Sequence, residues 1–175
     1  MSPAVEVFLP FFHSTQEVLM ANLSVIRSVV VLLAIFVTGL LAGVMLGVGM
    51  EQQTAQKLPE AAWTLRQQDD DALFRKVMPF TFIAMMLLLI ASIFLLHGRS
   101  RMVMVAATVA ALAVIIVTAG WEVPINNEIV KWTPGNAPAN WTSTRDKWLH
   151  NHWVRTWIGV LAFGCALLSS LLITD

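Results

Sequence analysis

The sequence has no tyrosine, a single cysteine and few charged side chains. Of its 175 residues 57% are apolar and 13% are charged, against ~25% charged residues in an average soluble domain. Because eleven basic residues balance eleven acidic ones, the chain has no positive field to hold nucleic acid. Cys165 has no partner in the chain, which excludes an intramolecular disulfide and a CxxC metal site. The composition therefore disfavours a water-soluble domain and any nucleic-acid partner.

Four uncharged apolar stretches are long enough to cross a bilayer core. Each is close to the ~20 residues that a transmembrane helix needs. The stretches comprise residues 28–50, 77–96, 102–121 and 156–174. They predict an all-α, multi-pass protein of the cell membrane, in which residues 1–175 form a single domain built as a transmembrane four-helix bundle.

Two long connections, residues 51–76 and 123–155, contrast with the short one at 97–101. With four spans, the long connections share one side of the membrane, and the termini and the short connection share the other. All seven tryptophans lie in or beside the long connections, whereas an aromatic belt places tryptophan at both interfaces. We therefore expect a helical extramembrane cap. The positive-inside rule read literally places the long connections in the cytoplasm, but the count loses force if several of these cations are folded into a site, so the sidedness of the cap stays open.

Local signals predict two helix starts. Leu58-Pro59 is typical of the first turn of a helix. Ser14, with Glu17 three residues on, has the capping-box pattern, so we expect the first helix to start near Ser14. The apolar residues around Pro10 would then form a non-helical interfacial tail.

Three glycines of the first span recur every four residues: Gly39, Gly43 and Gly47. Such a stripe of small residues lets another helix approach closely. It predicts close packing within the bundle or in a homo-oligomer.

One stripe of side chains could carry chemistry. Its members are Trp141, Arg145, Trp148, His152 and Arg155, spaced four, three, four and three residues apart. This is the spacing of one helix face, so we expect the fourth helix to begin about three turns before the membrane and to run unbroken. Arginine binds oxyanions, tryptophan supplies flat walls and histidine moves protons. The stripe predicts a pocket for a small lipophilic aromatic or enolic molecule, with His152 as the base and both arginines as oxyanion clamps.

The histidines also allow a metal site to be considered. Positions i and i+2 lie ~200° apart on a helix, so His150 and His152 cannot close on one ion. His152 combined with His13, Glu122 or Glu128 leaves a copper or iron site open. In the structural alternative, the tryptophans anchor the interface and the long cations snorkel.

The end of the third span adds further candidates. Pro124 suits the first turn of a short helix that would carry Asn126 and Asn127. These amides could orient Arg145 or His152 or contact a ligand; alternatively, they satisfy turn backbone. Glu122 could act as a base or as a counter-ion to Arg155. The remaining candidates for ligand contact are Trp63, Arg66, Trp121 and Trp132.

At these residues the sequence resembles a family of small four-span membrane proteins that includes the anthrone oxygenases of aromatic polyketide pathways. The resemblance rests on Gly39-Leu-Leu-Ala-Gly43, Leu58-Pro59 followed by Trp63, Pro124-Ile-Asn-Asn127, Trp132, and the series Arg145, Trp148, His152, Arg155. It implies an oxygenase that inserts oxygen into an activated aromatic carbanion, often without a prosthetic group. The alternative is a non-catalytic membrane protein that binds a lipid, quinone, haem or metal ion. Copper, iron and haem stay open as cofactors.

Overall fold

The described part of the chain consists of helices and the short segments that join them. A computed structural model of the protein gives the backbone of residues 3–173 and the side chains of residues 16–173. The elements in chain order are α1 (Pro3–Ala55), α2 (Glu60–Leu95), α3 (Gly98–Val117), the π-helix η1 (Thr118–Glu122), α4 (Val123–Ile129) and α5 (Trp141–Leu171). The prediction of an all-α fold is confirmed, since the described residues hold no strand.

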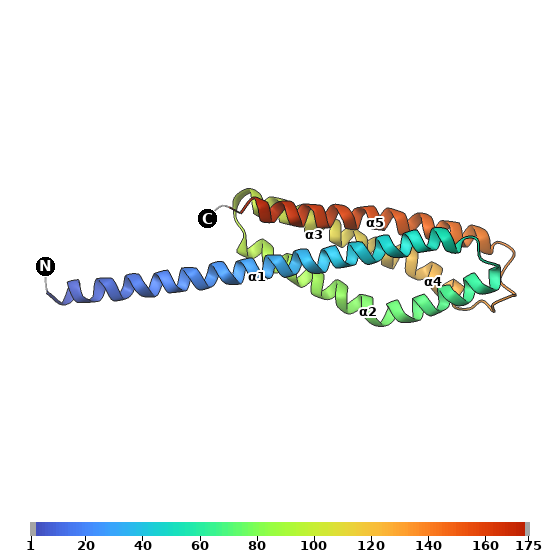
Figure 1. Cartoon of the computed structure of the whole chain (residues 1–175), viewed down its shortest axis with the longest axis horizontal. Coiled ribbons are helices and arrows are strands. Elements are labelled where there is room, and N and C mark those ends of the chain that lie inside the picture. The colour runs from blue at the N-terminus through green and yellow to red at the C-terminus, as the bar shows by residue number, and fades with distance from the viewer. Residues whose placement is uncertain (1–2, 174–175) are drawn as a thin grey trace.

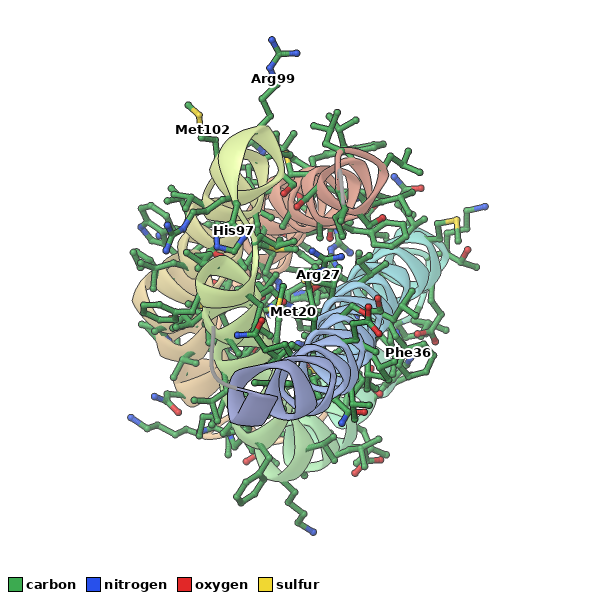
Figure 2. The ribbon with its side chains drawn as sticks, turned by 90° about the vertical axis from the view of Figure 1, so that its left-hand side faces the viewer. Met20, Arg27, Phe36, His97, Arg99 and Met102 are labelled. Carbon is green, nitrogen blue, oxygen red and sulfur yellow. The ribbon has the colours of Figure 1, made fainter. Side chains whose placement is uncertain are left out.

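Four helices are long and apolar enough to cross a membrane, as predicted. They are Gln16–Ala55, Glu60–Leu95, Gly98–Ile129 and Trp141–Leu171. Figure 1 shows them side by side along one long axis, with the C-terminus and the α2–α3 turn at one end and the α1–α2 and α4–α5 connections at the other. At the outer surface, large apolar side chains such as Phe36 and Met102 point away from the bundle (Figure 2), as lipid-facing side chains do.

Small side chains bring the helices close together in the membrane part of the bundle. The core contains alanines of α1, α3 and α5, namely Ala34, Ala107, Ala111, Ala162 and Ala166. In lipid, close packing of this kind drives helix association. Gly39 takes part, because a Cβ there would lie 2.7 Å from the ring of Phe163 on α5. A Cβ at Gly43 or Gly47 would meet no described atom within 4 Å, so their use between copies of the chain stays a prediction.

The cap is formed by the ends of the long helices together with α4 (Figure 1). The fully buried indole of Trp63 lies at its centre, with ring centroids 6.4 Å from Trp132 and 5.9 Å from Trp141. Gln68 on α2 donates hydrogen bonds from Nε2 to the carbonyls of Ile129 at 3.0 Å and Trp132 at 2.9 Å. Indole packing and these backbone contacts hold α2 against α4.

Two predicted helix starts have different outcomes. α2 begins at Glu60, directly after Leu58-Pro59, as predicted. The prediction of a start near Ser14 is wrong, because α1 begins at Pro3 and passes through Pro10. A proline removes one backbone hydrogen bond, but a helix that bends locally can continue on both sides of it. His13, a candidate metal ligand, lies outside the residues whose side chains are described.

The short helix predicted with Pro124 in its first turn is present as α4, and it follows the third span through η1 without a break in helical structure. Pro124 has no N–H for the carbonyl four residues earlier. The chain forms the π-turn η1 instead, in which the N–H of Val123 binds the carbonyl of Thr118. The extra residue in this turn accompanies a change of facing, with Glu122 inside the bundle and Trp121 on its surface.

Candidate functional site

A cavity of about 810 Å³ lies between α1, α2, the end of α3, η1, α4 and α5, next to the cap. Its volume is within the range of small-molecule sites. Its walls towards the membrane are apolar and include Met78, Phe82, Met86 and Ile115. Its polar lining comes from several helices: Gln52 on α1, Gln67, Asp70, Asp71 and Arg75 on α2, Thr118, Glu122 and Asn126 on η1 and α4, and His152 and Arg155 on α5. The cavity therefore combines an apolar body with a small set of charged and polar groups.

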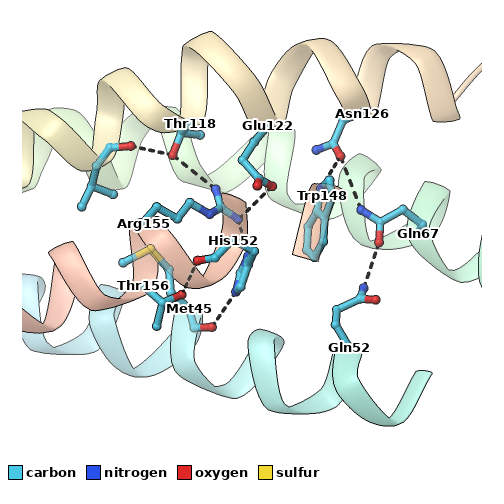
Figure 3. A network of polar contacts seen from close by, with 11 residues as sticks. Met45, Gln52, Gln67, Thr118, Glu122, Asn126, Trp148, His152, Arg155 and Thr156 are labelled. Carbon is cyan, nitrogen blue, oxygen red and sulfur yellow. Dashed lines mark hydrogen bonds and ion pairs between the residues drawn. The ribbon is translucent and has the colours of Figure 1, made fainter. Parts of the chain in front are cut away.

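Arg155 is the centre of the polar network (Figure 3). Its Nη1 donates to Thr118 Oγ1 at 3.2 Å, and its Nη2 lies 2.8 Å from His152 Nδ1. The same Nη2 is 3.6 Å from Glu122 Oε2. Nε of Arg155 has no hydrogen-bond partner among the described residues. Residues of η1 and α5 thus fix the guanidinium, and its buried Nε keeps one N–H without an acceptor among the described residues.

The hydrogen bonds of His152 define its tautomer. Its Nε2 lies 2.7 Å from the carbonyl oxygen of Met45, which can only accept, so Nε2 carries the proton. Its Nδ1 accepts from Arg155, since a guanidinium can only donate. The ring also stacks on Trp148, with centroids 4.9 Å apart and planes 17° apart. Both nitrogens of His152 are engaged with protein atoms, which leaves the imidazole to hold Arg155 in place.

Gly49 makes room for this imidazole. A Cβ at Gly49 would lie 3.2 Å from His152 Cδ2 and 3.1 Å from Trp153. The bare backbone of α1 therefore lets α5 approach until His152 reaches the carbonyl of Met45. Gly49 lies two residues beyond the glycine stripe, and its role emerges only when α1 and α5 are placed together.

Glu122 is the least satisfied polar group of the site. Its side chain is 1% exposed, and no described residue donates a hydrogen bond to either carboxyl oxygen. Arg155 is its ion-pair partner, at a separation too long for a hydrogen bond. Burying a carboxyl group without hydrogen bonds is costly, so this side chain is suited to accept a proton or a hydrogen bond from a molecule in the cavity.

Amide side chains close the cavity towards the cap (Figure 3). Asn126 Oδ1 accepts from Trp148 Nε1 at 2.8 Å and from Gln67 Nε2 at 3.4 Å. Gln67 Oε1 accepts in turn from Gln52 Nε2 at 2.8 Å. This amide ladder, Gln52–Gln67–Asn126–Trp148, connects all four long helical segments. Sequence reasoning missed both glutamines, because an amide near a helix end is ordinary and carries no motif.

The stripe predicted on the fourth helix divides into two parts. α5 runs unbroken from Trp141 to Leu171, and Trp148, His152 and Arg155 line the cavity. Arg145 does not reach it: its Nη1 donates to the carbonyl of Gln56 at 3.0 Å. Its guanidinium also pairs with Asp146 and lies 5.1 Å over the ring of Trp141. Because α1 ends beside this turn of α5, the carbonyl of Gln56 has no helical partner and accepts the hydrogen bond from Arg145 instead.

The other candidates for direct ligand contact lie outside the cavity lining: Trp63, Arg66, Trp121, Asn127 and Trp132. Trp63 and Trp132 form the core of the cap. Arg66 is paired with Glu51 and Asp70. Asn127 accepts a hydrogen bond from Arg75 Nη2 at 2.7 Å on the surface, whereas Asn126 faces inward, because neighbouring residues of a helix point about 100° apart.

Metal ligands are sparse among the described side chains. No group of three or more His, Cys, Asp or Glu residues in that part of the chain could hold an ion. His152 and Glu122, the pair predicted from the sequence, both line the cavity. However, the two ring nitrogens of His152 already contact Met45 and Arg155.

The fold and the site define a class of small helical proteins in which four helices of membrane-spanning length enclose a ligand cavity. The profile of the family described as Anthrone oxygenase matches residues 71–165, more than half of the chain. The chain belongs to the anthrone oxygenase family, which confirms the resemblance. The matched segment includes Glu122, Asn126, Trp148, His152 and Arg155. No curated protein and no solved structure matches the chain.

Proposed function

We propose that this protein is an integral membrane oxygenase that oxidises a small lipophilic aromatic ketone with an acidic CH2 group, such as an anthrone. The observation that carries the proposal is the buried, unbonded carboxyl group of Glu122 facing Arg155 in a largely apolar cavity. Family membership supports the same class of reaction.

In this mechanism Glu122 is the base that removes a proton from the CH2 group. The negative charge moves onto the ketone oxygen, where Arg155 stabilises it through its N–H groups. A fixed donor aimed at developing charge contributes ~3–4 kcal/mol, and a positioned base contributes about 100- to 10,000-fold in rate. His152, proposed as the base from its sequence position, becomes a positioning residue for Arg155 because neither of its ring nitrogens is free.

Molecular oxygen is the only oxidant that the reaction needs. The carbanion transfers an electron to O2, and the two radicals combine into a carbon-bound peroxide anion. This anion takes back the proton that Glu122 had removed, which gives the hydroperoxide and restores the carboxylate. Breaking the O–O bond of the hydroperoxide with loss of the second CH2 proton leaves one oxygen in the new carbonyl and releases the other as water. The ketone loses four electrons and O2 gains four, so no external reductant is consumed. The apolar wall around Phe82 and Met86 keeps bulk water from the carbanion.

The test is oxygen uptake by the full chain in lipid nanodiscs with 1,8-dihydroxyanthrone, corrected for spontaneous oxidation. We expect one anthraquinone per O2, and a loss of about 100- to 10,000-fold in kcat for Glu122→Gln, which keeps the shape of the side chain but cannot act as a base. Glu128→Gln, an exposed change in α4, is the matched control. Equal rates for Glu122→Gln and wild type would refute the base assignment. Binding of the ketone without oxygen uptake by the wild type would support the non-catalytic alternative.

A further inference from the structure

Part of the cavity lining lies at the surface of the molecule between α2 and η1–α4. Five lining residues are exposed and apolar: Pro79, Ile83 and Leu87 on one side, and Ala119 and Val123 on the other. The side chains of Ile83 and Leu87 are 58% and 63% exposed. Residues that both line a cavity and face outward form the rim of an opening. This rim lies in segments that are apolar enough to cross a membrane.

Two prolines account for the opening. Pro79 lies inside α2 and has no N–H for the carbonyl four residues earlier, and α2 bends away from the bundle near its middle (Figure 1). Opposite it, Pro124 follows the π-turn that sets the course of α4. Nearer the α2–α3 turn, the helices close again through the fully buried side chains of Leu89 and Met104. The gap is therefore confined to the level of Glu122.

The side of the cavity towards water is closed by hydrogen bonds. The amide ladder crosses its cap end. Arg75 on α2 binds Asp71 and also donates to Asn127 on α4, which ties the two helices together above the opening. A ligand coming from water would have to break these contacts, whereas one coming through the side opening passes the five apolar rim residues, and the charged Arg75 at its cap end is held by Asp71 and Asn127.

We infer that the cavity takes its ligand from the hydrocarbon of the bilayer, through the opening between α2 and η1–α4. The chemistry of this route selects a flat, uncharged, lipophilic molecule with a hydrogen-bonding oxygen. Because Ala119 and Val123 flank Glu122 in the chain, such a molecule meets the carboxyl group as it passes the rim. The identity of the ligand rests on the proposed function, but the route does not depend on Glu122 being a base.

The route can be tested with the full chain in nanodiscs and two probes. The first is 1,8-dihydroxyanthraquinone, which dissolves in lipid, and the second is anthraquinone-2-sulfonate, whose fixed charge keeps it out of hydrocarbon. Association and dissociation are followed by the fluorescence or absorbance of the probe. Leu87→Trp and, independently, Ile83→Trp narrow the opening. Leu161→Trp is the matched control, since Leu161 lies on α5 outside the cavity lining and is 60% exposed.

We expect each rim variant to slow association and dissociation of the lipophilic probe by about tenfold or more. Because both steps use one opening, the Kd should change far less than either rate. Leu161→Trp should behave like wild type, and the sulfonate should associate much more slowly than the lipophilic probe. Rim variants with wild-type rates, or a sulfonate that associates equally fast, would overturn the route and leave the proposed function standing. A wild-type protein that binds neither probe would overturn both.

Discussion

Replacing His152 with glutamine separates a positioning role from a proton-transfer role. In the structure, His152 donates to the carbonyl of Met45 and accepts from Arg155. A glutamine side chain also carries one donor nitrogen and one acceptor oxygen on its terminal group, so it can make both contacts. It cannot take a proton at neutral pH. If His152 only holds Arg155, His152→Gln should keep most of the activity.

The matched variant is His152→Phe, which retains a ring to stack on Trp148 but makes neither hydrogen bond. It leaves one N–H of Arg155 without its acceptor, at about 1–3 kcal/mol for a buried unsatisfied group, and removes the second hydrogen bond to the Met45 carbonyl, which keeps its bond within α1. We expect a loss of stability of this order and a clear loss of kcat, because Arg155 then keeps only its hydrogen bond to Thr118 and the longer ion pair with Glu122. His152→Gln should stay within about tenfold of wild type, a difference of ~1.4 kcal/mol.

The assay is oxygen uptake with 1,8-dihydroxyanthrone, measured beside the thermal unfolding of each variant in the same nanodiscs. The unfolding data show whether a variant without activity is still folded or has lost its stability. A folded His152→Gln variant as inactive as Glu122→Gln would refute the reasoning, since it would show that the imidazole transfers a proton.

Two further predictions use matched pairs. Gly49→Ala should lower kcat and shift the Tm downwards, because its Cβ would lie 3.2 Å from His152 Cδ2. The control Gly47→Ala should leave both unchanged, since its Cβ would meet no described atom within 4 Å. Equal effects of the two variants would contradict the role of Gly49. Arg145→Ala should destabilise the cap by ~1 kcal/mol and leave the Kd for 1,8-dihydroxyanthraquinone within about twofold of wild type. Arg155→Ala should weaken binding of the same probe about tenfold or more. A comparable loss of affinity in both variants would place Arg145 in the site.

The membrane bundle could be predicted because long apolar runs determine both the number and the length of the spans. The course of the fourth helix was equally accessible, since a 4-3-4-3 spacing without proline or glycine describes one helix face. That spacing does not say where the facing helix ends. α1 stops at Ala55, so the first turn of α5 meets free carbonyls and Arg145 is used there. Only from Trp148 onward does the face look into the cavity.

The direction of Glu122 could not be read from the sequence. On a regular helix continued from α3, its position would follow the ordinary period of 3.6 residues. The π-turn at Thr118–Glu122 adds a residue and changes that phase, and nothing but Pro124 marks it in the sequence. The hydrogen-bond partners of Asn126 could not be predicted from the sequence either. Gln52 and Gln67 come from two other helices and meet it only in the folded bundle.

The arrangement of charges argues against a purely structural ion pair. A buried pair contributes to stability only when its geometry is good and the remaining lone pairs are hydrogen-bonded. Here Arg155 donates its hydrogen bonds to Thr118 and His152, while the oxygens of Glu122 receive none from the described residues. Such a pair destabilises the protein while no ligand is bound in the cavity. A ligand that offers an acidic C–H to Glu122 and an oxygen to Arg155 supplies the two contacts that the protein itself leaves out.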